Sequence, residues 1–291
     1  MSGPPYDVLV VGSVNADLVV RVDRRPAAGE TVLGSDLVTH PGGKGANQAV
    51  AAARLGGQVA FLGRAGTDGH GDFVREALQG DGVDISHLIT TPGPNGVALI
   101  TVGPEGDNSI IVSPGANARL REDDITAAGA LFAAASVVSL QLEIPLPAVT
   151  AAARTAAAAG ARVVLNPSPP TGVPDELLAL CDPLVVNEHE AAFLGDTDPA
   201  GLLARGPRSV VITRGAEGAM VADRSGVAEV SSPQVQVVDT TGAGDAFTGA
   251  LCHRLAEGDD LTSAARFAAR VGAAAVRKPG AQSSFPALSD L

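Results

Sequence analysis

Short apolar runs alternate with helical segments through the second half of the chain, and this order constrains the fold more than any other feature. The apolar runs are 136–140, 162–165, 184–186 and 209–212, and the helical segments between them are 148–159, 175–180 and 189–194. Strands separated by helices form βαβ units, in which the strands run parallel. We therefore expect an α/β fold with a doubly wound, mostly parallel sheet flanked by helices.

The rest of the chain extends this pattern. Predicted strands lie at 7–11 and 59–62, and predicted helices lie at 46–55, 71–78, 243–256 and 261–276. There is no internal repeat and no linker long enough to separate two independent domains. The sequence therefore predicts a single domain over residues 1–291.

Two pairs of segments differ from this pattern, because polar and apolar residues alternate along them. Residues 18–22 and 31–39 form the first pair, and residues 96–102 and 108–112 form the second. Alternation is typical of antiparallel strands with one exposed face. We expect these pairs to form a small β-sheet lid, built from inserted segments at about 14–41 and 94–113.

Charge and composition disfavour several classes of partner. The net charge of −12 argues against nucleic-acid binding, which needs a basic face. Cys181 and Cys252 lie far apart and match no metal-binding spacing, so we expect reduced, structural thiols. The first residues lack the pattern of a signal peptide, and no apolar stretch is long enough to span a membrane. We expect a soluble, cytoplasmic protein without a nucleic-acid or membrane partner.

Residues 239–247, Asp-Thr-Thr-Gly-Ala-Gly-Asp-Ala-Phe, carry the strongest chemical signal. They follow a β-like run at 235–238 and open a predicted helix. Gly242 and Gly244 allow a tight turn whose N–H groups point at one anion, and the helix dipole adds to the attraction. Asp245 stands in the first turn, where its carboxylate can accept a proton. An anion site beside a base suits phosphoryl transfer to a hydroxyl, although an Asp near a helix start is more often a cap.

A second glycine cluster, residues 42–48, reads Gly-Gly-Lys-Gly-Ala-Asn-Gln. It is neither a P-loop, because glycine follows Lys44, nor a dinucleotide fingerprint. Lys44 and Asn47 share one face of the following helix and suit a polyhydroxylated ligand, while a flexible turn with an N-cap is the alternative. Asn15 and Asp17, two residues apart on an extended segment, match a pair of vicinal hydroxyls.

Polar residues also follow other predicted strands, and the carboxyl ends of parallel strands meet at one edge of a sheet. His189 with its two neighbouring glutamates lacks the paired-His spacing of a zinc site. Asn187 and Glu190 suit a hydrated magnesium ion near phosphates instead. The two-glycine turn at 213–218 either lies against a nucleotide or is an ordinary hairpin turn. Glu143 and Asn166 would lie on the same edge.

Together these motifs resemble the ribokinase family, the PfkB-type carbohydrate kinases, along nearly the whole chain. The matching segments are 12–17, 29–31, 42–49, 115–117, 141–143, 165–167, 187–190, 213–215 and 239–245. The resemblance implies ATP-dependent phosphorylation of the 5-hydroxyl of D-ribose. A kinase of the same family that acts on a deoxyribose, ketose or nucleoside is the nearest alternative. A non-catalytic sugar-binding protein on the same fold is a more distant one.

The resemblance also implies roles for individual residues. Asp245 would take the hydroxyl proton, and the anion hole would consist of Gly242, Ala243 and Gly244. The sugar pocket would consist of Asn15, Asp17, Gly43, Lys44, Gly45, Asn47 and Glu143. The nucleotide would lie along Asn187, Thr213, Arg214, Gly215, Gly218, Gly244 and Ala269, with Glu190 on the magnesium side. Ala269 stands where the family can carry His, which leaves nucleotide preference open.

A monovalent cation, usually potassium, is implied as well, held largely by backbone oxygens beside the anion hole. The matching positions are Asp239, Thr241, Ala275, Lys278, Gly280 and Ser284. Lys278 replaces a common arginine, but carbonyl ligands do not depend on that side chain. The lids of the family often pair between subunits, so the resemblance also implies a homodimer formed through the lid.

Overall fold

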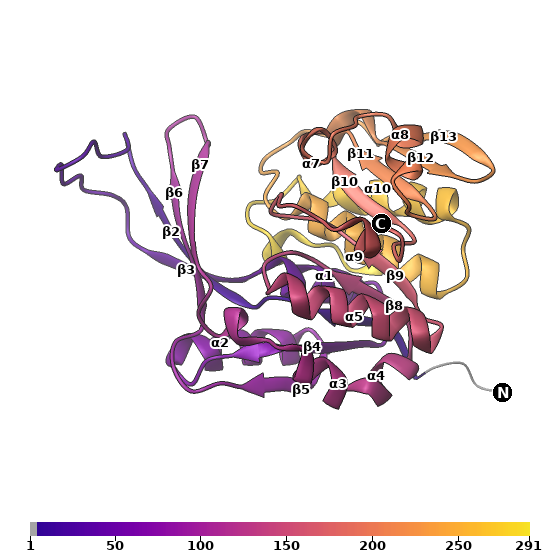
Figure 1. Cartoon of the computed structure of the whole chain (residues 1–291). Helices are drawn as coiled ribbons and strands as arrows, with labels where there is room; N and C mark the ends of the chain where they lie inside the picture. The colour runs from indigo at the N-terminus through magenta and orange to yellow at the C-terminus, as the bar shows by residue number, and fades with distance from the viewer. Residues whose placement is uncertain (1–4) are drawn as a thin grey trace.

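Nine strands form the main sheet in the structure, a computed structural model that describes residues 5–291. They are β1 (Tyr6–Val11), β4 (Val59–Ala65), β5 (Asp84–Thr90), β8 (Ala135–Leu140), β9 (Arg162–Leu165), β10 (Leu184–Asn187), β11 (Val210–Thr213), β12 (Ala219–Asp223) and β13 (Gly226–Val230). Their order across the sheet is β13-β12-β11-β10-β9-β8-β1-β4-β5 (Figure 1). All neighbouring strands run parallel except at one edge, where β12 runs antiparallel to both β11 and β13. The predicted doubly wound, mostly parallel sheet is confirmed.

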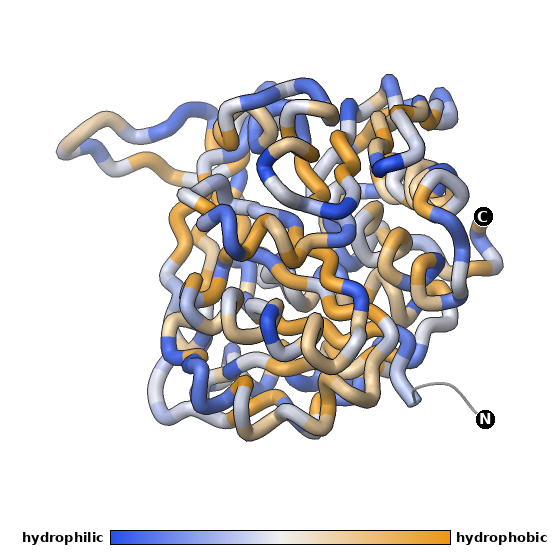
Figure 2. Tube along the Cα trace, turned by 45° about the vertical axis from the view of Figure 1, so that its right-hand side comes forward, coloured by the Kyte–Doolittle hydropathy of each residue, from blue (hydrophilic) through white to orange (hydrophobic). Residues whose placement is uncertain are grey.

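Helices cover both faces of this sheet. One face carries α1 (Lys44–Arg54), α2 (Gly69–Gly80), α9 (Ala243–Ala256) and α10 (Leu261–Ala275). The other carries α3 (Glu122–Ala127), α4 (Gly129–Ala133), α5 (Leu146–Ala159), α6 (Asp175–Leu178), α7 (Glu188–Phe193) and α8 (Pro199–Ala204). Alternate strand residues supply the two cores: Val8 and Val10 pack on the first face, and Leu9 and Val11 on the second. The apolar segments accordingly run through the middle of the molecule in Figure 2.

The helices α1 and α9 pack against each other unusually closely, because small residues line their contact. A Cβ atom on Gly249 would lie 2.5 Å from the backbone oxygen of Gln48 and 2.7 Å from the Cβ of Ala51. This approach brings the first turns of both helices, with Asn47 and Asp245, within hydrogen-bonding distance of each other. The alanine-rich sequence thus positions the site as well as filling the core.

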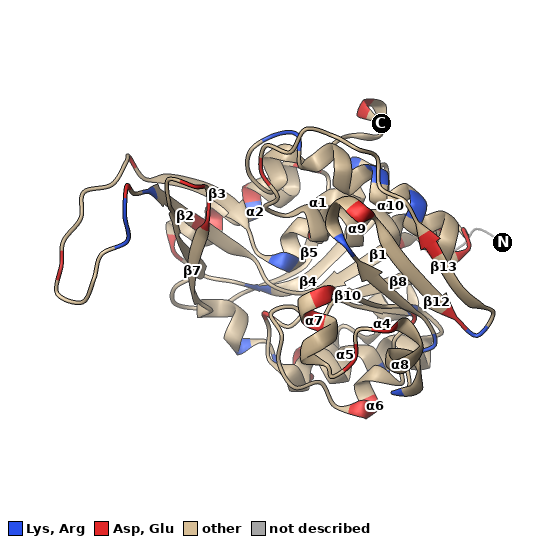
Figure 3. Ribbon diagram, turned by 90° about the horizontal axis from the view of Figure 1, so that it is seen from above, with Lys and Arg blue, Asp and Glu red and all other residues tan. Residues whose placement is uncertain are grey.

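Four further strands form a separate small sheet, which stands beside the main body in Figure 1. They are β2 (Asn15–Arg21), β3 (Val38–Gly42), β6 (Gly96–Val102) and β7 (Asn108–Ser113), in the order β3-β2-β6-β7. The predicted antiparallel pairs are present, and β2 joins them by running parallel to β6. We call this sheet, with the arm of residues 22–37 that joins β2 to β3, the lid. The arm carries charges of both signs (Figure 3), including the ion pair of Arg24 with Glu30.

Two predicted strands are wrong. The strand expected at 31–39 begins only at Val38, because the register pairs Asn15 with Gly42 and leaves residues 31–37 in the arm without a partner strand. The β-like run at 235–238 is not a strand either. Val237 and Val238 are more than half exposed, and the N–H of Val238 donates to the carbonyl of Val276 just beyond α10. The local sequence pattern alone therefore gave the wrong prediction at both places.

Two further expectations concern thiols and membranes. Cys181 and Cys252 are both free and buried, as expected of structural thiols. Of the helices that the structure describes, none combines the length and the apolar character needed to cross a bilayer.

Candidate active site

Helix α9 begins at a glycine turn without a side-chain cap. Gly242 takes the N-cap position with φ 75°, and a Cβ atom there would lie 2.8 Å from the Cβ of Ala281. The first N–H groups of such a helix lack intrahelical partners and attract an anion, assisted by the helix dipole. Asp245 lies in this first turn but makes no capping hydrogen bond. The explanation of Asp245 as a helix cap is therefore wrong.

Two side-chain amides of α1 hold the carboxylate of Asp245 instead. Nδ2 of Asn47 donates to Oδ2 at 2.9 Å, and Nε2 of Gln48 donates to Oδ1 at 3.1 Å. Asp245 is 7% exposed, so these bonds fix the position of its carboxylate in a largely dry environment. Oε1 of Gln48 accepts hydrogen bonds from Ser139 and Gln141 at 2.7 and 2.6 Å, which determines the orientation of its amide. The arrangement holds the carboxylate of Asp245 in a fixed position beside the glycine turn.

The residues predicted for the sugar lie at the base of the lid. Asn15 and Asp17 begin β2, and both side chains point to the same side of that strand. Oδ1 of Asn15 accepts a hydrogen bond from Nδ2 of Asn117 at 2.8 Å, which leaves its NH₂ group available as a donor. The Asp17 carboxylate lies against Gly42 of β3, where no side chain obstructs it.

Glu143 connects this side of the site to the start of α1. Its Oε2 accepts hydrogen bonds from Oγ of Ser13 at 2.6 Å and from the N–H of Lys44 at 3.0 Å. Gly43 has φ 89°, and a Cβ atom on Gly45 would lie 2.6 Å from the N of Ser13. The two glycines therefore let the loop pack against the end of β1, and Gly43 takes the N-cap position of α1, as the alternative expected.

Charges at the site shift two pKa values. Burial, together with the negative charges of Glu143 and Asp245, raises the pKa of Asp17 to about 7. Burial alone lowers the pKa of Lys44, but the negative charges of Asp245, Glu143 and Glu190 outweigh it and raise that pKa. Lys44 therefore stays positive among carboxylates, where it attracts an anionic ligand.

A cavity of about 380 Å³ lies at this edge of the sheet. Its lining includes eight of the predicted site residues, namely Lys44, Asn187, Glu190, Thr213, Gly215, Gly242, Gly244 and Asp245. The other lining residues are Asn166, Ser168, Val185, Val186, Glu188, His189 and Thr248, whereas the predicted residues Ala243, Arg214 and Gly218 do not line it. The structure thus brings together residues from positions 44 to 248 of the chain. The lining does not include Ala269, which is buried in the core formed with α10, nor Asn15 and Asp17, which lie toward the lid.

The nucleotide side of the cavity is formed by two short elements. Residues 213–218 form a hairpin between β11 and β12, closed by the N–H of Arg214 donating to the carbonyl of Gly218 at 2.8 Å. The hairpin interpretation is therefore correct, and Thr213 and Gly215 nevertheless line the cavity. Gly218 has φ 96° and is packed against Val230, so it is required by the turn itself.

Asn187 and Glu190 form a capping box at the start of α7. Oδ1 of Asn187 accepts from the N–H of Glu190 at 2.8 Å, and Oε2 of Glu190 accepts from the N–H of Asn187 at 2.9 Å. Glu190 still faces the cavity, so its carboxylate fits the water shell of a magnesium ion that is bound mainly by phosphates. Within residues 5–291 no cluster of three or more His, Cys, Asp or Glu side chains offers an all-protein metal site.

The positions implied for potassium lie in two segments that Asp239 ties together. Oδ1 of Asp239 accepts from the N–H and Oγ1 of Thr241 at 2.9 and 2.6 Å, and Oδ2 accepts from the N–H of Gly280 at 2.8 Å. Within the described chain, the carbonyl oxygens of Thr241, Lys278 and Gly280 accept no hydrogen bond from the protein. Free carbonyl oxygens beside a carboxylate fit a hard monovalent cation. The carbonyl of Ala275 accepts from the N–H of Lys278, and the hydroxyl of Ser284 donates to Ala281.

Several residues of this network were not predicted as site residues. They are Ser13, Gln48, Asn117, Ser139, Gln141 and Gln282, and all are buried. A buried polar residue within an alanine-rich helix, as at Gln48, is the signal that would have identified one of them.

Comparison with known proteins agrees with this geometry. Residues 6–288 match the family described as pfkB family carbohydrate kinase. The ribokinase of Bacillus subtilis is 40% identical over 292 residues, which cover 98% of each chain. Ribokinase of Thermotoga maritima has a structure with a TM-score of 0.91 at 32% identity, covering 98% of this chain and 97% of that one. The structure of Arabidopsis thaliana ribokinase complexed with ribose and ATP has a TM-score of 0.90 at 35% identity, covering 99% and 97%.

Proposed function

This chain belongs to the pfkB family of carbohydrate kinases, and we propose that it uses ATP to phosphorylate the 5-hydroxyl of D-ribose, giving ribose 5-phosphate and ADP. The similarity to ribokinases, one of them with a structure complexed with ribose and ATP, supports these two substrates. The observation that carries the proposal is the single cavity in which Asp245, the glycine turn of α9 and the nucleotide side meet.

The chain's own residues perform the proton and charge handling. Asp245 accepts the proton of the 5-hydroxyl while the oxygen of that hydroxyl attacks the γ-phosphorus of ATP. The bond between the γ-phosphorus and the oxygen that bridges it to the β-phosphate breaks, and ADP leaves. The N–H groups at Gly242, Ala243 and Gly244 stabilise the negative charge on the transferring group, and Lys44 adds a positive charge from the opposite helix. Asn47 and Gln48 keep the base oriented toward the sugar.

The sugar is held from the lid side. Asn15 and Asp17 bind its hydroxyls, and the start of α1 with Glu143 completes the pocket. Closure of the lid over the sugar excludes water and so limits hydrolysis of ATP.

Kinases of this kind act on ATP with a divalent metal, for which we propose magnesium. Glu190 would hold its water shell on the side of the phosphates. We also propose a potassium ion between the segments of Thr241 and Gly280, where its positive charge would strengthen the anion site at the start of α9. Bound there, the two ions would neutralise phosphate charge.

We propose in addition that the protein is a homodimer formed through the lid. Among residues 5–291, strand β7 pairs only with β6, so its other edge is open in this part of the chain. Apolar side chains are exposed along it, with Ile110 55%, Ile111 69% and Val112 46% exposed. Leu33 of the arm is 92% exposed. A second lid would cover this apolar surface.

A sugar panel tests the proposed function. Release of ADP is measured with ribose, deoxyribose, fructose and adenosine, each with and without potassium, and the position of the phosphate is read by nuclear magnetic resonance. Ribose should be the fastest substrate and its product the 5-phosphate. Faster turnover of adenosine or deoxyribose would instead support the alternative of a nucleoside or deoxyribose kinase on the same site. The Asp245→Asn protein controls for contaminating kinases.

A further inference from the structure

We propose that Gln282 is a positioning residue for the phosphoryl transfer, which holds the side chain of Asn47 so that its amide N–H points at Asp245. The inference rests on the proposed function, in which Asp245 is the base. It also gives a role to the ion pair of Arg54 with Asp81, which lies outside the lining of the cavity.

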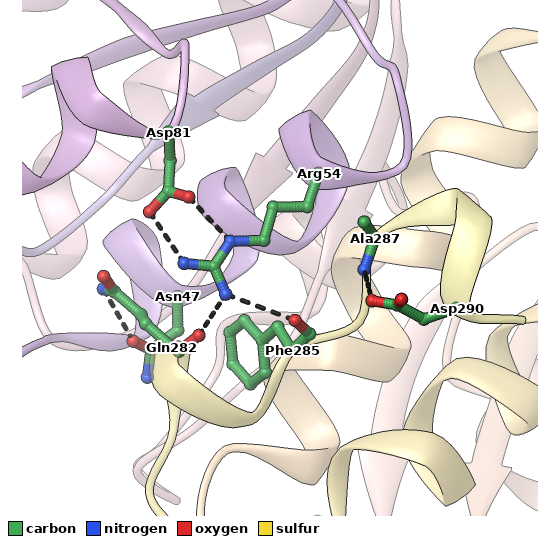
Figure 4. A network of polar contacts seen from close by, with 7 residues as sticks. All are labelled: Asn47, Arg54, Asp81, Gln282, Phe285, Ala287 and Asp290. Carbon is green, nitrogen blue, oxygen red and sulfur yellow. Dashed lines mark hydrogen bonds and ion pairs between the residues drawn. The ribbon is translucent and has the colours of Figure 1, made fainter.

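Gln282 reaches the base through one intermediate side chain. Its Nε2 donates a hydrogen bond to Oδ1 of Asn47 at 3.0 Å (Figure 4), and Nδ2 of Asn47 donates to Oδ2 of Asp245 at 2.9 Å. Gln282, Asn47 and Asp245 are 3%, 6% and 7% exposed. Because bulk water cannot replace a partner at such depth, each bond constrains the next.

The chemistry of the amide gives this chain of bonds a direction. Asn47 has a donor end and an acceptor end, and only the donor end stabilises an ionised carboxylate. Because Gln282 supplies a donor to Oδ1, the orientation with Nδ2 toward Asp245 satisfies both ends. Without that donor, rotation of the amide costs less, and Asp245 keeps only Gln48 as a lasting amide partner.

Arg54 holds Gln282 in place from the other side (Figure 4). Its Nε and Nη2 donate to the two carboxylate oxygens of Asp81 at 2.6 and 3.1 Å. Its Nη1 donates to the carbonyl oxygens of Gln282 and Phe285, the latter at 3.2 Å. A guanidinium fixed by a bidentate carboxylate therefore ties α1 to the turn η3 (Gln282–Ser284).

Both partners of the bond between Gln282 and Asn47 are thus attached to one helix. Asn47 belongs to α1, and Arg54 lies on the same helix. Gly280 and Ser284, two positions implied for potassium, flank Gln282 in the chain. The side chain of Gln282 therefore links that segment to the base through Asn47.

A double-mutant cycle on the full-length protein tests this role. Gln282→Met keeps the length of the side chain and removes the donor, so kcat should fall about 10-fold while the KM for the sugar changes less than about threefold. In the Asn47→Ala background the same substitution should lower kcat no further, because the residue it acts through is gone. An equal loss of kcat in both backgrounds would overturn the proposal.

Two further comparisons separate positioning from stability. Gln282→Glu keeps the size but presents an acceptor to Oδ1 of Asn47, so its kcat should fall at least as far as that of Gln282→Met. Asp81→Asn and Asp124→Asn are matched, because Arg54 and Arg64 each make a two-bond, partly buried pair with their aspartate. Both should lower the melting temperature, and only Asp81→Asn should lower kcat. Unchanged kcat in Gln282→Glu, or equal kcat in the two aspartate variants, would overturn the inference.

The assay uses whichever sugar the wild type phosphorylates fastest. A preference for a sugar other than ribose therefore contradicts the proposed substrate, while the cycle still decides the role of Gln282. Wild-type protein without kinase activity on any sugar would overturn the proposed function and this inference together.

Discussion

The carboxylate of Asp17 occupies the space that a β-carbon on Gly42 would need, since a Cβ atom built there would lie 2.1 Å from Oδ2. The two residues lie on the neighbouring strands β2 and β3, whose register pairs Asn15 with Gly42. Any side chain at position 42 must therefore displace the Asp17 carboxylate or the strand itself.

Substitution of Gly42 should accordingly weaken sugar binding. We expect Gly42→Ala to raise the KM for ribose about 10–100-fold, with a smaller change in kcat, because in the proposed sugar pocket the displaced carboxylate would contact the sugar in both ground and transition states. Steady-state kinetics at saturating ATP measures this. Gly129→Ala is the matched control, because a Cβ atom there meets no atom within 4 Å. An unchanged KM in Gly42→Ala would contradict the place of Asp17 in the sugar pocket.

Asp17 should also make stability depend on pH. Its pKa rises from 3.8 to about 7 in the folded protein, so the folded state binds the proton more tightly than the unfolded state. The contribution of this group to the free energy of unfolding is fully present below about pH 4 and is lost as the pH rises to about 7. Asp17→Asn removes this ionisable group, so between pH 5 and pH 8 the melting temperature of the variant should rise relative to that of the wild type. Since each pKa unit corresponds to about 1.4 kcal/mol of stability, the relative rise should be several degrees.

Thermal unfolding without sugar measures this difference. Asp36→Asn, on the exposed arm of the lid, is the control and should show the same offset from wild type at both pH values. A constant offset for Asp17→Asn would show that burial and the neighbouring carboxylates do not raise its pKa.

Asp245 should be needed for turnover and dispensable for sugar binding. Asp245→Asn keeps the shape of the side chain and removes the proton acceptor, so kcat should fall about 10²–10⁴-fold. The affinity for ribose, measured by calorimetry without nucleotide, should change only a few-fold. Activity close to that of wild type would refute the assignment of Asp245 as the base.

The oligomeric state should depend on the exposed edge of the lid. Ile111→Lys places a charge on β7, and sedimentation should show a shift from dimer to monomer, because a lysine opposes pairing of edge strands. Val227→Lys, on β13, is the control, since Val227 is exposed to a similar extent, 54% against 69%. A wild type that is monomeric at all concentrations would exclude the dimer.

The sequence predicted elements best where a helix or strand is long and periodic. The helix expected at 243–256 has the same bounds as α9, because its alanine-rich pattern and glycine turn agree with its packing. The strand expected at 31–39 was wrong because strand pairing, which depends on a partner distant in sequence, decides whether an alternating segment becomes a strand. In the lid that partner is β2, whose pairing with β3 ends at Val38.

The motifs indicated candidate site residues, but not the contacts that these residues make. Asn47 and Asp245 lie in separate glycine-rich motifs, and their hydrogen bond depends on how closely α9 approaches α1 at Gly249. Gln282 has no motif of its own, because its role depends on the hydrogen bond it makes to Asn47. Packing between distant elements is therefore the information that the motifs lack.

Asp239 should control the response to potassium. Its carboxylate joins the N–H groups of Thr241 and Gly280, which holds the free carbonyl oxygens of the two segments close together. Asp239→Asn removes a negative charge and replaces one acceptor by a donor, so the potassium concentration for half-maximal activity should rise more than about 10-fold. Activity titrated with potassium chloride at constant ionic strength measures this. Asp260→Asn, which changes only the N-cap of α10, should leave the titration unchanged. If wild-type activity is the same in sodium and potassium, the cation does not bind between these segments, and Asp239 serves only to hold them together.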